Sequence, residues 1–324
     1  MNDILTLSVR ELAARIASRT LTAEAVVRAC IERIHSREPQ IQAWQFFDPE
    51  LALRAARLRD AQPSTGPLHG VPVGVKDLMD TADMPTTYGS PIYAGYRPQI
   101  DAACVAAARR AGAVVLGKTV TTEFATFQPG PTCNPHAVDG APRTPGGSSS
   151  GSAAAVAAGM VPVAFGTQTA GSIVRPAAYC GLVGYKPTHG TLPLAGIKSL
   201  APSLDTVGVL ARSVGDAAFF VGTLARLPLA AQAAGRLRVG ICRTPHWERA
   251  GVDSRQALAA AARLLEQGGA IVSDLALPAA CAGLTEAQIT IMGYEAAAAF
   301  EPEAQTRAED LSSAFAGLLA AGRA

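Results

Sequence analysis

The chain has 324 residues and a formal net charge of +2, with 49% hydrophobic and 17% charged residues. This length fits one large domain or two ordinary ones, and the apolar content excludes an intrinsically disordered chain. The near-neutral charge and an aromatic content of only 5% give no sign of a surface for nucleic acid or for an anionic membrane.

Helix-capping residues predict three helices near the N-terminus. Ser8 and Glu11 have the spacing of a capping box, in which two free backbone N–H groups gain side-chain acceptors. Thr22 can cap a second helix, because its hydroxyl can accept from another such N–H group. Asp48 followed by Pro49 predicts a third helix, since proline fits a first turn where its missing N–H is not needed.

Strands and helices alternate through the rest of the chain. Short apolar runs predict strands at 71–75, 113–116, 161–165, 182–185, 237–242 and 270–273. Helical patterns occur at 101–110, 153–158, 173–179, 213–226 and 254–266, and in two Ala-rich stretches at the end. This alternation is typical of an α/β fold with a central mixed β-sheet covered by helices on both faces. Residues 228–235 are the best candidate for a linker, with a surface loop as the preferred interpretation.

The cysteines and the apolar segments indicate the compartment. The six cysteines are scattered, without a CxxC pair or a histidine at metal-ligand spacing, so we expect reduced thiols and no metal site. The N-terminus has no basic leader before an apolar run, and the longest uncharged run, 153–166, is shorter than a membrane span. We therefore expect a cytoplasmic protein that does not cross a membrane.

One segment matches a phosphate-binding loop in its letters but not in its context. Residues 112–119 fit the expression GxxxxGK[ST]. A real phosphate loop follows a strand and opens a helix, whereas here residues 113–116 are themselves a predicted strand and Gly112 ends the preceding helix. We therefore reject nucleotide binding and expect Lys118 to lie on the surface.

Two Gly/Ser-rich turns carry the strongest chemical signal. Residues 146–152 and 166–172 each precede a predicted helix, and a helix and a strand separate them. A serine at a tight turn into a helix has an exposed Oγ, and the backbone N–H groups nearby lack partners within the helix. Because such N–H groups can stabilise a developing oxyanion, this pattern is typical of a nucleophilic serine.

A nucleophilic serine needs a base, and no histidine is well placed to serve. The five histidines lie in loops, turns or polar segments, where structural or solvated roles are expected. Lys76 ends an apolar strand, and burial there would lower its pKa and favour the neutral form. The competing interpretation, of equal weight, is a surface lysine paired with Asp77 or Asp80.

Two blocks of the chain resemble the amidase signature family of serine hydrolases. Residues 146–188 resemble its signature block, and residues 70–77, GVPVGVKD, resemble its lysine motif. The resemblance runs from about Ser8 to the last residue and implies the amidase-signature fold. It also implies a catalytic triad of Lys76, Ser148 after a cis peptide bond, and the nucleophile Ser172. The oxyanion-hole N–H groups would then come from Thr169, Ala170, Gly171 and Ser172, and the supporting hydroxyls from Thr167 and Ser149.

The same resemblance implies an amidase. The enzyme would cleave a carboxamide C–N bond of a small molecule through an acyl-enzyme on Ser172, releasing a carboxylate and ammonia or an amine. No metal or organic cofactor is implied, and a homo-oligomer could form. One alternative is the A subunit of a glutamyl-tRNA(Gln)/aspartyl-tRNA(Asn) amidotransferase, which releases ammonia from glutamine for a partner subunit; only in this case is nucleic acid expected. A catalytically silent, truncated fragment is the other.

Three positions and the length depart from the family pattern. The family commonly has Asp at Gln168, Gly at Ala170 and Arg at Val174, where this chain has Arg175 one place later. These differences favour a free-standing amidase over the amidotransferase version. The family also usually continues further, so we expect residues 1–324 to be a single amidase-signature domain without the C-terminal part. An open sheet edge would then lower solubility or be buried in an oligomer.

Overall fold

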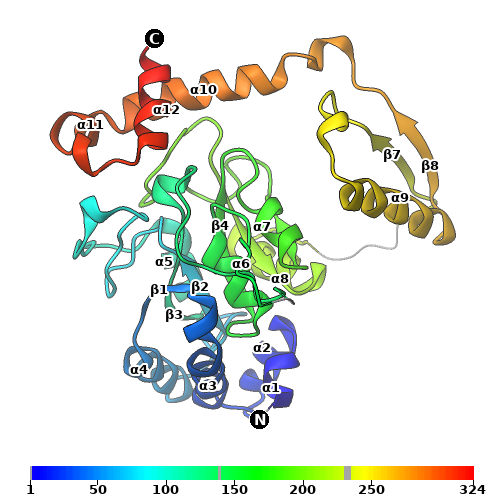
Figure 1. Cartoon of the computed structure of the whole chain (residues 1–324). Coiled ribbons are helices and arrows are strands. Elements are labelled where there is room, and N and C mark those ends of the chain that lie inside the picture. The colour runs from blue at the N-terminus through cyan, green and yellow to red at the C-terminus, as the bar shows by residue number, and fades with distance from the viewer. Residues whose placement is uncertain (1, 138–139, 230–234) are drawn as a thin grey trace. The chain divides into compact units, whose positions relative to one another are not determined.

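The computed structural model describes residues 2–137, 140–229 and 235–324. Contacts divide these residues into two compact units, which can be followed by colour in Figure 1. The larger unit contains the described residues up to 229 together with residues 291–324, and the smaller unit contains residues 235–290. The candidate linker, 228–235, includes residues 230–234, which lie outside the described residues.

The larger unit is built on a mixed sheet. Within the described residues its strands are β1 (Trp44–Phe47), β2 (Pro72–Lys76), β3 (Val114–Thr119), β4 (Val163–Gln168), β5 (Val183–Tyr185) and β6 (Thr206–Ala211). Their spatial order is β1-β3-β2-β4-β6-β5. Strand β2 is parallel to both β3 and β4, whereas β1, β5 and β6 each pair antiparallel with a neighbour. The mixed sheet predicted from the sequence is confirmed.

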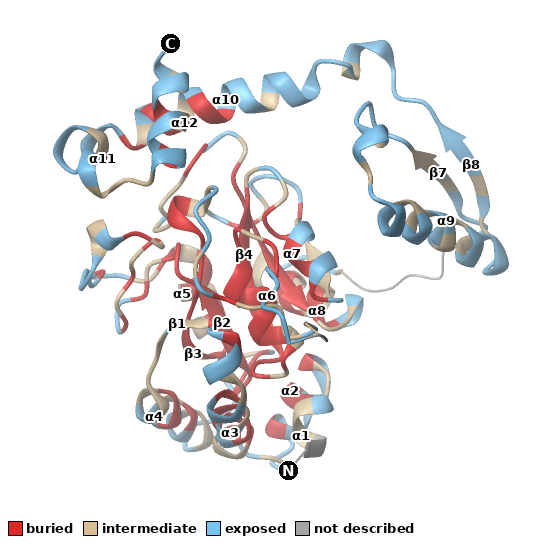
Figure 2. Ribbon diagram, in the orientation of Figure 1, coloured by how far each residue is buried: buried red, intermediate tan, exposed pale blue. Residues whose placement is uncertain are grey.

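Helices cover both faces of this sheet, also as predicted. They are α1 (Asn2–Thr6), α2 (Val9–Ala17), α3 (Ala23–Ile41), α4 (Pro49–Asp60), α5 (Ala103–Arg110), α6 (Ser150–Ala157), α7 (Val174–Tyr179) and α8 (Val214–Ala225). Val115 and Phe165 join the apolar cluster formed with α2, α5 and α8, whereas Val114 and Ala164 join the cluster formed with α3, α4 and α6. Because side chains alternate along a strand, covering both faces requires nearly continuous apolar strands. Figure 2 shows the resulting buried strands in red.

The predicted helix caps are confirmed. Glu11 N–H donates to Ser8 Oγ at 3.1 Å, and Ser8 N–H donates to Glu11 Oε2 at 2.9 Å, which completes the capping box of α2. The hydroxyl of Thr22 caps α3, and the carboxylate of Asp48 accepts from the first-turn N–H groups of α4. Local side-chain chemistry therefore sets where these helices begin.

Strands β1 and β6 and helix α1 were not predicted. Strand β6 consists of six buried residues, TVGVLA, and a fully buried strand lacks the alternation that separates it from a buried helix. Strand β1 has only four residues, too few for a period to be read. Both strands therefore become visible only through their pairing with β4 and β3.

The chain beyond residue 235 forms a parallel strand pair and further helices. Strands β7 (Arg238–Cys242) and β8 (Ile271–Leu275) are connected by α9 (Val252–Gln267). Helix α10 (Leu284–Ala299) follows, and then α11 (Glu301–Thr306) and α12 (Ser313–Arg323) in the larger unit. There, Phe300 and Phe315 pack against Phe124, with ring centroids 4.7 and 5.0 Å away. Among the helices of residues 2–137, 140–229 and 235–324, none has the length and apolar character needed to span a bilayer.

Candidate active site

Lys76 is the last residue of β2 and is completely buried. Its Nζ donates hydrogen bonds to Ser148 Oγ at 2.7 Å and to Thr167 Oγ1 at 2.8 Å. Burial lowers the pKa of Lys76 from 10.5 to about 7; the charge of Asp205 opposes this effect and the charge of Arg175 adds to it. Near neutral pH a large share of Lys76 is therefore a neutral amine that can accept a proton.

Ser148 lies in the loop before α6 and is almost completely buried. The peptide bond between Gly147 and Ser148 is cis. Arg175 donates to the Gly147 carbonyl from both Nε and Nη2, at 2.9 and 2.8 Å. On the other side of the serine, Thr122 N–H donates to the Ser148 carbonyl at 3.3 Å. The backbone on both sides of Ser148 is thus fixed while its Oγ contacts Lys76.

Ser172 lies in the turn between β4 and α7, with 6% of its surface exposed. The N–H of Ser149 donates to the Ser172 carbonyl at 3.2 Å, which joins this turn to the loop that carries Ser148. Within the part of the chain that the structure describes, the Ser172 hydroxyl forms no hydrogen bond. It is therefore not committed to a structural role.

Gln168 organises the same turn from the end of β4. Its Oε1 accepts from the N–H groups of Ile173 and Val174, at 2.9 and 3.0 Å, and its Nε2 donates to the Ala170 carbonyl at 3.0 Å. These bonds use N–H groups at the start of α7, whereas those of residues 169–172 donate no hydrogen bond to any described residue. The unused N–H groups are those that the family resemblance assigned to an oxyanion hole, and they can stabilise negative charge.

The other serines of the 146–152 turn anchor α6 to the sheet. Their hydroxyls donate to backbone carbonyls: Ser149 to Thr167 at 3.3 Å, Ser150 to Val120 at 3.3 Å and Ser152 to Phe165 at 2.8 Å. Ser148 differs from them because its Oγ contacts Lys76. Thr167, expected to supply a supporting hydroxyl, accepts a hydrogen bond from Lys76 Nζ through that hydroxyl.

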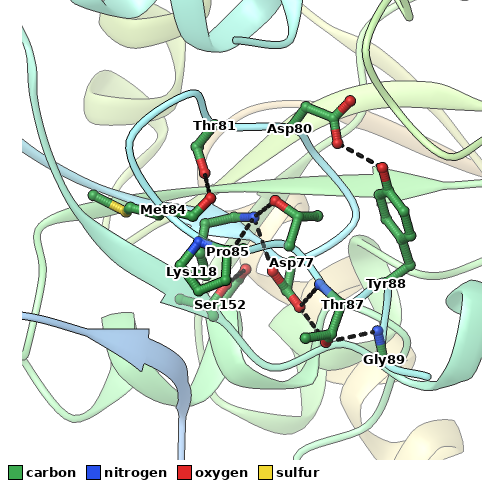
Figure 3. Close-up of polar contacts among 12 residues, drawn as sticks. Asp77, Asp80, Thr81, Met84, Pro85, Thr87, Tyr88, Gly89, Lys118 and Ser152 are labelled. Carbon is green, nitrogen blue, oxygen red and sulfur yellow. Dashed lines mark hydrogen bonds and ion pairs between the residues drawn. The ribbon is translucent and has the colours of Figure 1, made fainter. Parts of the chain in front are cut away.

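A buried ion pair occupies the neighbouring strand end. Lys118 Nζ lies 2.8 Å from Asp77 Oδ1, and both side chains are fully buried. Figure 3 shows this pair beside Thr87, whose N–H and hydroxyl donate to Asp77 Oδ2 at 2.9 and 2.6 Å. Lys118 also donates to Thr86 Oγ1. The expectation of a surface Lys118 is wrong, because β3 extends to Thr119 and pairs with β2 through this residue.

The two acidic residues near Lys76 are engaged elsewhere. Asp77 pairs with Lys118, and Asp80 accepts a hydrogen bond from Tyr88 at 2.7 Å. The interpretation of Lys76 as a surface lysine paired with one of these carboxylates is therefore wrong. The rejection of a phosphate-binding loop is supported, since residues 114–119 form strand β3 and open no helix.

The histidines take no part in this arrangement. Three of them bond backbone carbonyls through Nε2: His69 to Arg59, His136 to Cys180 and His189 to Pro202, at 2.9, 3.1 and 3.1 Å. His246 contacts Thr285, and His35 packs edge-on against Phe47. These contacts agree with the structural roles expected for them.

A cavity of about 240 Å³ adjoins the site. Gly147 and Arg175 line it, together with Thr122, Thr126 and Phe127 from the segment after β3. Pockets for drug-sized ligands measure roughly 300–1,000 Å³, so this space suits a smaller molecule or one group of a larger one. The cavity borders the peptide bond that precedes Ser148.

Several residues of the site were not predicted in their roles. Gln168 and Arg175 were noted only because they depart from the family pattern. That departure was the one sequence feature that could have pointed to their roles in the site. The buried Lys118 was masked by its place in a phosphate-loop expression. Asp205, which acts on the pKa of Lys76, lies in a loop of ordinary composition and gave no signal.

Comparison with known proteins identifies the family. The family model described as Amidase matches residues 25–320. The chain is 46% identical over 235 residues to the A subunit of the glutamyl-tRNA(Gln) amidotransferase of Acidothermus cellulolyticus, a match that covers 69% of this chain and 46% of that protein. It is 40% identical over 311 residues to the A subunit of the same enzyme from Thermobifida fusca, covering 88% and 62%. The chain thus spans about half to three fifths of the length of these relatives.

Solved structures share the architecture. A crystal structure described as an amidase superposes with a TM-score of 0.89 at 32% identity, covering 98% of this chain and 74% of that one. The native peptide amidase of Stenotrophomonas maltophilia superposes with a TM-score of 0.80 at 33% identity, covering 98% and 75%.

Proposed function

The chain belongs to the amidase signature family, and we propose that it hydrolyses a carboxamide C–N bond through an acyl-enzyme on Ser172. The family and fold expected from the sequence are confirmed. The observation that carries the proposal is the 2.7 Å contact between Lys76 Nζ and Ser148 Oγ, in an environment that lowers the pKa of the lysine to about 7. A nucleophilic hydroxyl must lose its proton, and a neutral lysine can receive one.

The proposed reaction has two halves. In the first, Ser172 Oγ attacks the carboxamide carbon, Ser148 takes the hydroxyl proton and passes its own proton to neutral Lys76. The tetrahedral intermediate then expels ammonia or an amine, which leaves protonated by the reverse relay. In the second half, water attacks the acyl-enzyme by the same relay and releases the carboxylic acid and free Ser172. The N–H groups of residues 169–172 would stabilise the oxyanion in both halves.

A covalent probe tests the nucleophile directly. Incubation of the full chain with a fluorophosphonate, followed by peptide mass spectrometry, is expected to place the adduct on Ser172. Ser172→Ala should lose both labelling and ammonia release from primary carboxamides. Ser152→Ala is a matched control, because it removes a buried serine hydroxyl that anchors α6 but should leave Ser172 reactive. Labelling that persists in Ser172→Ala, or that falls on Ser148 in the unaltered chain, would overturn the assignment.

The curated relatives favour one version of this chemistry, the A subunit of an amidotransferase that acts on glutamyl-tRNA(Gln). The amide would then be that of glutamine, and the ammonia would pass to a partner subunit. In the sequence, Gln168, Ala170 and Arg175 favour a free-standing amidase. The structure weakens this argument for Gln168. The side chain of Gln168 bonds backbone groups of its own turn, so it gives no separate indication of substrate.

Ammonia release under three conditions separates the two versions. An amidotransferase subunit is expected to hydrolyse glutamine slowly alone and faster with its partner subunits and glutamyl-tRNA(Gln). A free-standing amidase is expected to hydrolyse simple amides without a partner and to ignore the tRNA. Fast, partner-independent turnover of simple amides would exclude the amidotransferase version.

A further inference from the structure

Asp205 is a buried carboxylate beside the turn that carries Ser172. It immediately precedes β6, whose first residue, Thr206, pairs with Gln168 at the end of β4. Its Oδ1 accepts a hydrogen bond from the Thr169 hydroxyl. Its Oδ2 accepts from the loop that precedes β6: Ser199 Oγ at 2.6 Å, Leu200 N–H at 2.8 Å and Ala201 N–H at 3.1 Å. The carboxylate therefore ties the 169–172 turn to a second loop.

The charge of Asp205 has no counter-ion in direct contact. No salt bridge to it occurs among the described residues, and its oxygens are satisfied by neutral donors. Several neutral donors stabilise an ionised carboxylate in a buried position. An unpaired charge in a low-dielectric interior acts on other charges over a longer range than one at the surface. Lys76 lies near this charge, because its Nζ bonds Thr167 Oγ1 and the strand partner of Thr167 is Val207, two residues after Asp205.

We propose that Asp205 is a positioning residue, which holds Thr169 in the 169–172 turn and presents its charge to Lys76 across the adjoining ends of β4 and β6. This inference rests on the proposed function of Lys76 and Ser172. Asp205 thus links the two halves of the site, since one oxygen fixes the turn that carries the nucleophile and the net charge acts on the base. Neither task requires contact with the substrate.

The charges around Lys76 support a specific direction of change. Burial is the main cause of its lowered pKa; Asp205 raises that pKa and Arg175 lowers it. Asp77, the next residue in the sequence, has its charge paired with Lys118. Removing the Asp205 charge should therefore lower the pKa of Lys76 further. Opposite charges in contact shift a pKa by about 1–3, and because Asp205 does not touch Lys76 we expect a fall at the lower end of that range, about one pH unit.

The pKa of Lys76 can be measured directly, because the chain contains only four lysines: 76, 118, 186 and 198. Protein labelled with [ε-¹³C]lysine gives at most four side-chain signals, and Lys76→Met assigns the one of interest. A pH titration then reports the pKa of Lys76 without any turnover. Asp205→Asn keeps the size and an acceptor oxygen while removing the charge, and Asp205→Ser is a second charge-removing variant should the first fail to fold.

The matched control is Asp216→Asn. Asp216 is also a buried carboxylate with neutral donors, the N–H of Val9 at 2.6 Å and the hydroxyl of Ser213 at 2.9 Å. It follows the opposite end of β6, a strand about 17 Å long. The control should cost stability but leave the Lys76 titration unchanged. An unchanged Lys76 pKa in both Asp205 variants, or an equal fall in Asp216→Asn, would overturn the charge effect.

Thr169→Val tests the positioning effect separately. It removes the hydroxyl that bonds Asp205 but keeps the carboxylate, so the Lys76 pKa should stay the same while kcat falls about tenfold or more with little change in KM. Unchanged kcat would overturn this half of the proposal. In Asp205→Asn, the pH at which kcat rises to half its maximum should move to lower pH together with the measured pKa of Lys76. If the titration shifts but the unaltered chain shows neither labelling nor hydrolysis, the proposed function fails while the coupling between Asp205 and Lys76 stands.

Discussion

Replacing Lys76 with methionine should stabilise the protein at neutral pH, and the gain should shrink as the pH rises. Native Lys76 has its pKa lowered to about 7 by burial, whereas in the unfolded chain it returns to 10.5. Between these pH values Lys76 is protonated in the unfolded chain but neutral in the native protein. The destabilisation that comes from burying Lys76 is therefore largest below pH 7 and disappears towards pH 10.5. Each pH unit inside the window corresponds to about 1.4 kcal/mol of unfolding free energy.

From these pKa values, the difference in unfolding free energy between Lys76→Met and the unaltered chain should fall by roughly 2 kcal/mol between pH 7 and pH 9. The chain has two tryptophans, Trp44 in β1 and Trp247 in the smaller unit. In a Trp247→Phe background, urea denaturation followed by Trp44 fluorescence reports on the larger unit alone. All other titrating groups are common to both proteins and cancel. A difference that stays constant with pH would refute the buried, neutral lysine.

Three further results are expected. The kcat/KM of the unaltered chain should rise with pH with a midpoint near 7 as Lys76 deprotonates, and Lys76→Ala should lower it by about a thousandfold or more while His69→Ala changes it less than tenfold. Lys118→Met leaves Asp77 buried without its partner, so urea denaturation should show a loss of about 3–5 kcal/mol, and a loss below about 1 kcal/mol would contradict the ion pair. Arg175→Met removes two hydrogen bonds to the Gly147 carbonyl, next to Ser148, and should lower kcat by up to about a hundredfold, with the melting temperature as a check on folding.

More of the polar residues of the site could be predicted from the sequence than of the contacts that hold those residues in place. Lys76 and Ser172 could be found because each stands next to a local pattern, an apolar strand or a Gly-rich turn. The burial of Lys118 could not be found, because its partner Asp77 follows a different strand, β2, and a lysine in isolation favours the surface. Asp205 could not either, since its bond to Thr169 exists only once β6 pairs with β4. Interactions between segments distant in sequence leave no periodic trace.

The serine anchors of α6 bear on how this protein can be engineered. The 146–152 segment has the composition of the flexible linkers used to join domains, yet its serines are bonded to the sheet. A Cβ on Gly151 would come within 2.3 Å of backbone atoms of Ala43 and Val120, so even one methyl group does not fit there. A peptide tag or a circularly permuted terminus belongs instead at an exposed turn such as Gly283, where an added Cβ meets no atom within 4 Å and the backbone is not left-handed. Composition alone would direct the insertion to the wrong glycine.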